Sequence, residues 1–510
     1  PRSTQGVTFF PYTTLFRSHS HPFILRDANK CINCGRCVRT CAEIQGAAVL
    51  GFIYRGFSSV VAPEFGESLT ETTCESCGKC IAVCPVGALV EKNANYKLNP
   101  LLRENTLQSC GICGTGCLIQ SQTQTNEVVL IQAPQKDEER GFNGRNLCFN
   151  GRFGWQTLYA PQRLKLPRYK ENGIWKDISW AEARRVMAQK TPSLKNCHFE
   201  ISPRISLEEM LMLKAVANTR SAKLYASPAL QPLDSSLYSL KPDHNAYDKL
   251  DRFSEYVVVG KISHTLRTLL RVKQRQGKRL VLVNPPEAGF NRLADKVLHK
   301  LDELEPSAGQ LFIYNLNELS PRQIYSLYTV ALQLDPSGEN LWVGSNYANY
   351  WGLLALQPCF NLPAEAEFAL GWGCYPANSD KATFSVAIQL FADDEAPVDL
   401  LLPAPSYLEI EAHTLGDMAR PGLWMNPAKS MIINELMRVF YELGWIPPST
   451  AEINHWNLKV EELMAVLASR QVQNPSVDGL NPDTLSNEAA FPQYELDLRI
   501  KRLYESRRNT

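Results

Sequence analysis

The chain has 510 residues, and with 44% hydrophobic and 21% charged side chains its composition is that of a globular protein of about three or four domains. The 53 basic and 52 acidic residues nearly cancel, and no dense block of Lys and Arg occurs, which argues against nucleic-acid binding through bulk positive charge. No stretch approaches the roughly eighteen uninterrupted apolar residues of a membrane-spanning helix, so we expect no direct membrane span.

The first residues, PRSTQGVTFFPYTTLFRSHS, show neither a signal-peptide pattern nor an amphipathic period. GVTFFPYTTLFRS resembles translated sequencing-adapter sequence. We therefore expect residues 1–22 to be a non-native or disordered leader, and the native chain to begin further upstream.

Cysteine is the informative residue type. Twelve of the 15 cysteines fall into three tight groups before residue 150. Disulfide scaffolds spread their pairs through small secreted domains, whereas grouping at one end of a large chain indicates thiolate-bound metal. Thiolate ligands need a reducing compartment, which predicts a cytoplasmic protein.

The first two groups repeat one spacing, because residues 31–41 read CINCGRCVRTC and residues 74–85 read CESCGKCIAVCP. In two-cluster ferredoxins, the fourth cysteine of each such run binds the other cluster. We therefore assign one [4Fe–4S] cluster to Cys31, Cys34, Cys37 and Cys84, and a second to Cys41, Cys74, Cys77 and Cys80. Zinc knuckles are the alternative, but zinc sites usually pair two C-x2-C units across a gap. Residues 48–64 between the groups predict a β-hairpin that turns at Arg55-Gly56.

The third group opens with CGICGTGC at residues 110–117, and two alternating runs joined near Asn126 predict a hairpin after it. That hairpin is expected to return the chain to its start, so that Cys148 in GRNLCFNGRFGW lies beside the first three cysteines of the group. The third predicted [4Fe–4S] set is Cys110, Cys113, Cys117 and Cys148, and a structural zinc is the alternative.

Residues 166–450 alternate between strand and helix patterns, which favours a doubly wound α/β fold. Asn172-Gly173 predicts a hairpin turn, and capping boxes at Ser179/Glu182 and Ser206/Glu209 predict helices over about 180–190 and 207–219. One strand–helix–strand unit is expected from EYVVVG, a helix over about 264–275 and RLVLVNP. Further buried strands are expected in QLFIYNL, NLWVGS, FSVAIQLFAD and VDLLLPAP, and a charged terminal helix is expected at 493–507.

The third cysteine group, its hairpin and CFNGRFG together resemble the iron–sulfur domain that opens the molybdopterin oxidoreductases, such as formate dehydrogenases. The same domain occurs in the large iron–sulfur subunit of NADH:quinone oxidoreductase (complex I). The two earlier groups, preceded by RDANK, resemble soluble NAD-linked formate dehydrogenases and iron hydrogenases. Complex I generally retains one cluster in that region, so eight cysteines point away from complex I proper. The resemblance covers roughly residues 23 to 450.

Two features depart from the catalytic members of this family. Asn150 stands where they usually carry a lysine between the cluster and the pterin, and no cysteine lies between Cys197 and Cys359 to bind molybdenum. A serine ligand within SPALQPLDSSLYS stays open. The family's last, cofactor-clasping domain is not expected in the stretch after about residue 450. Molybdopterin guanine dinucleotide is therefore not the expected cofactor.

Other single residues are expected to pack rather than to react. We expect Cys197, Cys359 and Cys374 to be core thiols. We also expect four dispersed histidines to be packed or surface residues rather than proton shuttles. They are His244, His264, His299 and His413.

These patterns lead to one interpretation: an N-terminally truncated iron–sulfur electron-transfer subunit of a soluble NAD(H)-linked oxidoreductase complex, with three [4Fe–4S] clusters and no substrate site of its own. The resemblance implies two partners, a flavin-containing NADH-oxidising subunit and a small [2Fe–2S] subunit. It also implies that a [2Fe–2S] domain and a cluster held by one histidine and three cysteines have been lost upstream. The alternatives are a catalytic molybdenum or tungsten bis-pterin subunit of formate dehydrogenase type and a non-redox scaffold stabilised by zinc.

The expected organisation has five parts. They are a leader at 1–22, a two-[4Fe–4S] ferredoxin-type domain at 23–100, a small β-rich molybdopterin-oxidoreductase 4Fe–4S domain at 101–165, a degenerate molybdopterin-oxidoreductase-like α/β region at 166–450 and a polar, helical tail at 451–510.

Overall fold

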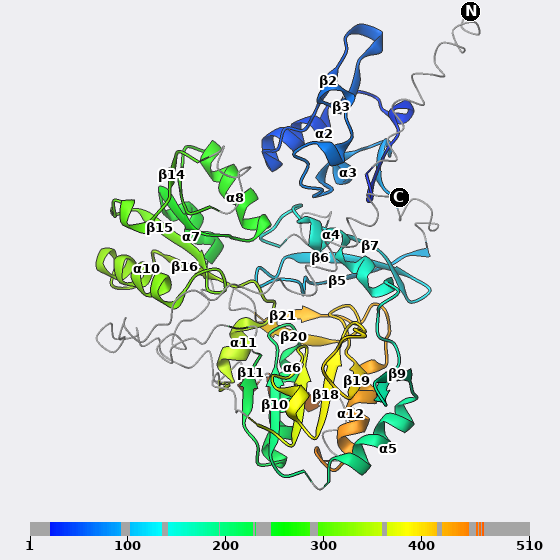
Figure 1. Cartoon of the computed structure of the whole chain (residues 1–510). Coiled ribbons are helices and arrows are strands. Elements are labelled where there is room, and N and C mark those ends of the chain that lie inside the picture. The colour runs from blue at the N-terminus through cyan, green and yellow to red at the C-terminus, as the bar shows by residue number, and fades with distance from the viewer. Residues whose placement is uncertain are drawn as a thin grey trace, which may run out of the picture.

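The computed structural model arranges the chain as a small ferredoxin-like part, a three-stranded sheet and two larger α/β units (Figure 1). The described residues are 21–92, 102–134, 141–192, 194–227, 230, 246–285, 294–356, 358–359, 365–415, 421–447, 455–456, 458–460 and 462–463.

The ferredoxin-like part is closed by its two ends. Strand β1 (Ile24–Arg26) pairs antiparallel with β4 (Leu89–Glu91), so that the start and the end of the part lie side by side. Each cysteine run leads into a short helix, and a hairpin lies between the runs. These elements are α2 (Arg36–Arg39), continued by a π-helix (Thr40–Gln45), the hairpin strands β2 (Leu50–Ile53) and β3 (Val60–Pro63), and α3 (Lys79–Val83).

The next part is an antiparallel sheet of three strands in chain order. They are β5 (Glu104–Ser109), β6 (Leu118–Gln124) and β7 (Glu127–Gln132). Thr125 and Asn126, both at positive φ, make the two-residue turn between β6 and β7. Helix α4 (Phe149–Phe153) and a 3-10 helix (Gly154–Tyr159) follow and pack against this sheet with Trp155 and Leu158.

The larger α/β unit is built on a seven-stranded sheet of order β11-β10-β17-β18-β19-β8-β9. Its first five strands are parallel, and β8 and β9 form an antiparallel hairpin at one edge. The strands are β8 (Arg168–Glu171), β9 (Ile174–Asp177), β10 (Cys197–Ile201), β11 (Leu224–Ala226), β17 (Phe368–Trp372), β18 (Phe384–Gln389) and β19 (Leu400–Pro403). The helices are α5 (Trp180–Lys190), α6 (Leu207–Thr219), α11 (Tyr350–Ala355) and α12 (Ile432–Glu442).

The second α/β unit is inserted in the chain between β11 and β17. Its five strands are all parallel, in the order β14-β13-β12-β15-β16. They are β12 (Glu255–Val259), β13 (Arg279–Val283), β14 (Lys296–Leu298), β15 (Gln310–Asn315) and β16 (Leu341–Gly344). Successive residues face opposite sides of a strand. Leu266 and Leu270 of α8 (His264–Arg275) therefore pack on one face, near α7 (Ala246–Arg252), and Leu327 of α10 (Pro321–Leu334) packs on the other.

A hairpin links the larger α/β unit to the three-stranded sheet. Its strands are β20 (Ala412–Leu415) and β21 (Pro421–Trp424). Glu208, fully buried in α6, accepts a hydrogen bond from the backbone N–H of His413 at 2.8 Å and pairs with its Nδ1 at 2.6 Å. On the other side, the backbone N–H of Met425 donates to the side chain of Gln108 in β5 at 2.8 Å. The hairpin therefore ties the two parts together.

Most of the expected elements are confirmed. The three hairpins, both capping boxes, the helices 180–190 and 207–219 and the strand–helix–strand unit from Glu255 to Val283 are all present. The patterns did not indicate β5, β10 or β17. The expected terminal helix at 493–507 lies outside the described residues, as do residues 1–20 and the tail from 464 onward.

His21 lies at the end of the expected leader and contacts the ferredoxin-like part. The imidazole of His21 is buried, bonds to the hydroxyl of Ser76 at 2.9 Å and accepts from the backbone N–H of Ile24 at 2.9 Å. These contacts fix the entry to β1.

Within the described residues, none of the helices has the length and apolar character needed to cross a membrane.

The two capping boxes give a matched test of burial, because Glu209 is buried whereas Glu182 is exposed. Each carboxylate accepts from the backbone N–H of its serine, at 2.7 Å from Ser206 and 2.8 Å from Ser179. Burial raises the pKa of Glu209 to about 7, whereas hydrogen bonds from Ser179 lower the pKa of Glu182. The folded state therefore holds the Glu209 proton more tightly than the unfolded state, and the stability this adds is lost as pH rises from about 4.5 toward 7.

We expect Glu209→Gln, which keeps the capping hydrogen bond, to remove this loss. Between pH 5 and pH 8 the Tm of the unmodified protein should fall by about 2–4 °C relative to the variant, measured by thermal unfolding. Glu182→Gln is the control and should show no pH-dependent difference. A constant Tm difference for Glu209→Gln across this range would contradict the raised pKa.

Candidate metal centres

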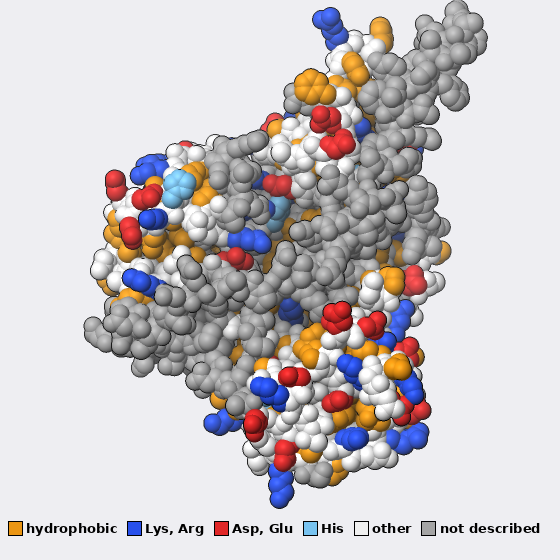
Figure 2. All heavy atoms as spheres, in the orientation of Figure 1, with side chains coloured by type: hydrophobic (Ala, Val, Ile, Leu, Met, Phe, Trp, Pro, Cys, Tyr) orange, Lys and Arg blue, Asp and Glu red, His pale blue; other side chains and the backbone are white. Residues whose placement is uncertain are grey.

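The first cysteine set lines one cavity in the ferredoxin-like part. Cys31, Cys34, Cys37 and Cys84 share this cavity with apolar side chains that include Ile32 and Val86. Gly35, at φ +69°, lets the loop reverse directly into α2, and the side chain of Asn33 holds the loop by donating to the carbonyl of Ser59 at 2.8 Å. Cys34 is exposed, and hydrophobic side chains are visible over this part at the top of Figure 2. The structure thus brings together the four residues expected to hold the first cluster, close to the surface.

The second set lines a neighbouring cavity. It consists of Cys74, Cys77 and Cys80 from the second run together with Cys41 from the first. Cys41 lies in the π-helix that continues α2, and Gly78, at φ +69°, opens α3 as Gly35 opens α2. Each run therefore contributes three cysteines to its own cavity and one to the other, which is the exchange that the spacing predicts.

The third set lies where the three-stranded sheet meets α4. Cys110 follows β5 and Cys117 precedes β6, and the backbone N–H of Cys110 donates to the carbonyl of Cys117 at 2.8 Å. The side chain of Asn143 accepts a hydrogen bond from the N–H of Leu118 and donates one to its carbonyl. These bonds hold the segment that leads to Cys148 beside the start of β6. Cys148 then caps α4 by accepting from the N–H of Gly151 at 3.2 Å. All four expected cysteines line one cavity.

Burial sets the protonation of these thiols. It raises the pKa of Cys37 to about 11 and of Cys74 to about 12, and it raises the pKa values of Cys80, Cys110 and Cys117 well above the usual value. Without a cation, these thiols are neutral at pH 7. A metal that binds here must displace their protons, so binding couples to proton release.

The donor set fits an iron–sulfur cluster. Each set of four free thiols surrounds a cavity with mostly apolar walls, as thiolate-bound clusters require. Among the described residues, no three His, Cys, Asp or Glu side chains gather closely enough to hold a single metal ion.

Two buried cations lie between the second and third sets, and sequence reasoning missed both. Lys79, inside the second run, donates through Nζ to Thr268 of α8 at 3.4 Å, and burial lowers its pKa to about 8. Arg152 of α4 is buried against Gly78 and lies 3.9 Å from the carboxylate of Glu91. Burial raises the pKa of Glu91 to about 7, although the charge of Arg152 opposes this shift. Nothing in the sequence around these residues distinguishes a buried cation from an exposed one.

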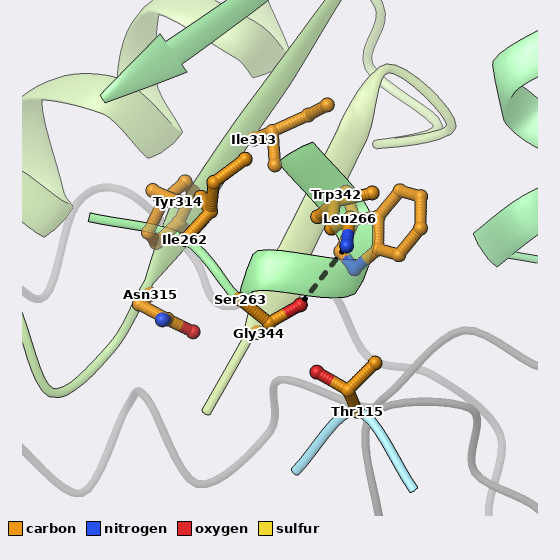
Figure 3. A pocket seen from close by; sticks show the side chains of 9 residues that line it. All are labelled: Thr115, Ile262, Ser263, Leu266, Ile313, Tyr314, Asn315, Trp342 and Gly344. Atoms are coloured by element: carbon orange, nitrogen blue, oxygen red, sulfur yellow. Dashed lines mark hydrogen bonds between the residues drawn. The ribbon is translucent and has the colours of Figure 1, made fainter. Parts of the chain in front are cut away.

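A further cavity lies at the carboxyl ends of β12, β15 and β16 (Figure 3). From β12 the chain first adds β13 and β14 on one side and then crosses to add β15 and β16 on the other. Open α/β sheets bind ligands at such a switch point. In this protein the cavity is lined by side chains of the five-stranded unit and by the loop of the third cysteine set. Trp342 and Tyr314 border it, Thr115 enters from the loop, and the N–H of Gly114 donates to the carbonyl of Ser345 at 3.2 Å.

The other candidate residues are mainly in packing positions. Cys197 is buried, and Cys359 and Cys374 are half-buried. His264 bonds Glu75 at 2.6 Å, His413 bonds Glu208, and the backbone N–H of His299 donates to Glu303. His244 lies outside the described residues. Asn150 is half-buried on α4, two residues after Cys148.

Comparison with known proteins agrees with this arrangement. Residues 21–90 match the ferredoxin-like domain of NADH-quinone oxidoreductase subunit 3, and residues 106–160 match the molybdopterin oxidoreductase Fe4S4 domain. These matches indicate iron–sulfur clusters as cofactors.

Among curated proteins, one of the NADH-quinone oxidoreductase subunits of Rhizobium meliloti is 33% identical over 232 residues, which are 43% of this chain and 26% of that protein. The alpha subunit of NADPH-Fe(3+) oxidoreductase of Geobacter sulfurreducens is 28% identical over 252 residues, 47% of this chain and 29% of that protein. A subunit of the NADP-reducing hydrogenase of Solidesulfovibrio fructosivorans is 49% identical over 90 residues, 17% of this chain and 15% of that protein. The relatives are oxidoreductase subunits, and the chain matches less than a third of the length of each.

Gly78 permits the contact between the second cysteine loop and α4. Its φ of +69° disfavours any side chain, and a Cβ there would overlap with Cδ of Arg152. We expect Gly78→Ala to lower the Tm by several degrees, because strain and overlap together cost about 2–4 kcal/mol.

The matched control is Gly56→Ala. Gly56 has a similar φ of +62°, but a Cβ there would meet nothing within 4 Å. Thermal unfolding should show a clearly smaller loss for the control. Equal losses would mean that the contact with Arg152 adds nothing.

Proposed function

We propose that the chain is an iron–sulfur electron-transfer subunit that relays single electrons through three [4Fe–4S] clusters. The observation that carries the proposal is that twelve cysteines line three cavities, four cysteines in each. Each of the first two cysteine runs contributes three cysteines to one cavity and its fourth to the other. Bound clusters would supply reversible one-electron chemistry, with potentials set by charge, hydrogen bonds and burial. The names of the relatives, which are oxidoreductase subunits, support the same function.

The protein's own residues hold, space and tune these centres. Cysteines in each cavity would bind one cluster, and the apolar walls limit access of water. Lys79 and Arg152 place positive charge between the second and third cavities. Such charge favours the more negative, reduced state of a neighbouring centre. This chemistry is spacing and tuning rather than bond making.

We infer that the α/β region is a doubly wound, degenerate molybdopterin-oxidoreductase-like fold without a substrate site of its own. Helices on both faces of the five-stranded sheet support the fold. Asn150 in place of the expected lysine, and the narrow cavity bordered by Trp342 at the switch point, fit a pterin poorly.

The proposal includes the expected partners and organisation. A flavin-containing NADH-oxidising subunit and a small [2Fe–2S] subunit would deliver or accept electrons in a soluble, NAD(H)-linked complex. The contacts of His21 support starting the first domain at residue 21, so the proposed domains are 21–100, 101–165 and 166–450. Twelve thiolate ligands need a reducing compartment, for which we propose the cytoplasm.

Metal analysis of the anaerobically purified chain tests the proposal. We expect about twelve irons per chain, four for each cluster, with reducible EPR signals. Cys148→Ala should lower the iron content by about a third, since it removes a ligand of the third set. Cys197→Ala is the control, because this buried cysteine lies outside the three sets, and it should leave the iron content unchanged.

The rival functions give different results. Zinc in place of iron, without a reducible signal, would establish a structural scaffold. Molybdenum or tungsten near one per chain would establish a catalytic subunit of formate dehydrogenase type. An unchanged iron content in Cys148→Ala would remove the third centre from the proposal.

A further inference from the structure

Helix α8 has a second buried face that its own sheet does not explain. Leu266 and Leu270 pack on the five-stranded sheet, as expected for an α/β helix. Thr265, Thr268 and Arg271, spaced three residues apart, are nevertheless only 3%, 1% and 4% exposed. Burying polar side chains is costly unless they are hydrogen-bonded. The partners of this polar face therefore indicate what the helix does.

Thr265, in the first turn, faces the third cysteine set. Its hydroxyl oxygen lies 3.3 Å from the sulfur of Cys117, and Ser263, His264 and Thr265 line the same cavity as the four cysteines. Ser263 caps the helix through the N–H of Leu266 at 3.3 Å, which fixes the position of this turn. A helix of the α/β region thus completes the wall of the third cavity.

The following turns contact the loops of the second set. Thr268 accepts from Lys79 at 3.4 Å, and Arg271 donates to the carbonyl of Gln45 and to Glu75 at 3.3 Å. These contacts border the second cavity, which Gln45, Glu75 and Lys79 line together with the cysteines. His264 adds its bond to Glu75 at 2.6 Å. One face of one helix therefore reaches two cysteine sets.

We propose, on the basis of the function proposed above, that Thr265 is a positioning residue that raises the reduction potential of the third centre, while Thr268 and Arg271 hold the second set against the same helix. A metal-bound thiolate has no proton, so the Thr265 hydroxyl must donate to Cys117. Reduction adds one electron to the centre, with no bond broken and no proton moved, and it increases the negative charge on the sulfur ligands. A hydrogen bond to that sulfur therefore stabilises the reduced state more than the oxidised state.

The test is an EPR-monitored redox titration with dithionite as the reductant, made on the full chain purified anaerobically. Thr265→Val keeps the shape of the side chain and removes its donor. We expect the equilibrium constant for reduction of the third centre to fall about tenfold, which is about 59 mV for one electron. Loss of the same centre's signal in Cys148→Ala identifies which signal belongs to it.

Two variants control this test. Thr265→Ser keeps a hydroxyl and should titrate as the unmodified protein does. Thr329→Val makes the same substitution on α10, where the hydroxyl donates to the carbonyl of Tyr325 at 2.9 Å and not to a cysteine. It should leave the potential of the third centre unchanged.

The outcomes separate this inference from the proposed function. If the unmodified protein shows no iron–sulfur signals, the proposed function fails. If those signals are present and Thr265→Val leaves every potential unchanged, the inference alone is overturned. If Thr265→Val abolishes the signal of the third centre, the potential of that centre in Thr265→Ser tests the hydrogen bond instead. A normal potential in the serine variant supports the hydrogen bond, and an altered potential or a lost signal contradicts it.

Discussion

The structure depends on holding twelve thiols, which range from buried to exposed, in three groups of four although the thiols attract one another only weakly. Burial raises the pKa of Cys110 and Cys117, which disfavours charge on these two, and all twelve cysteines are free thiols, so disulfides do not gather the groups. The surrounding backbone does this instead. Pairing of β1 with β4 closes the ferredoxin-like part, and Asn143 fastens the returning segment to β6. The cavities are therefore set by the fold, and metal binding would stabilise it further while releasing thiol protons.

The α/β units have a structural role that does not require a ligand of their own. At the switch point of the five-stranded sheet, the loop of the third cysteine set occupies the position over the strand ends. The β20–β21 hairpin fixes the three-stranded sheet through Gln108 on one side and Glu208 on the other. Helix α8 then spans the second and third sets. The α/β units thus frame the cysteine cavities, and the loop of the third cysteine set closes the edge of the five-stranded sheet.

The features that sequence predicted well are local. Asn172-Gly173 makes its turn because both residues tolerate positive φ, and each capping box joins residues three positions apart. The cysteine spacing predicted which residues share a cavity because ferredoxin runs follow a fixed exchange. Short buried strands such as β17 were missed, since an apolar run of five residues does not distinguish strand from helix. Thr265 and Cys117 are 148 positions apart, and only the tertiary fold brings them together.

The exposure of the cysteines differs along the molecule. Cys34 is open to solvent, whereas Cys110 and Cys117 are buried behind the three-stranded sheet and α8. Dioxygen and small oxidants therefore reach the outermost set first, since oxidation of sulfur follows accessibility. Damage in air is expected to proceed from the tip of the ferredoxin-like part inward, and the innermost set would survive longest. The α/β frame would then protect, as well as position, the centre that it encloses.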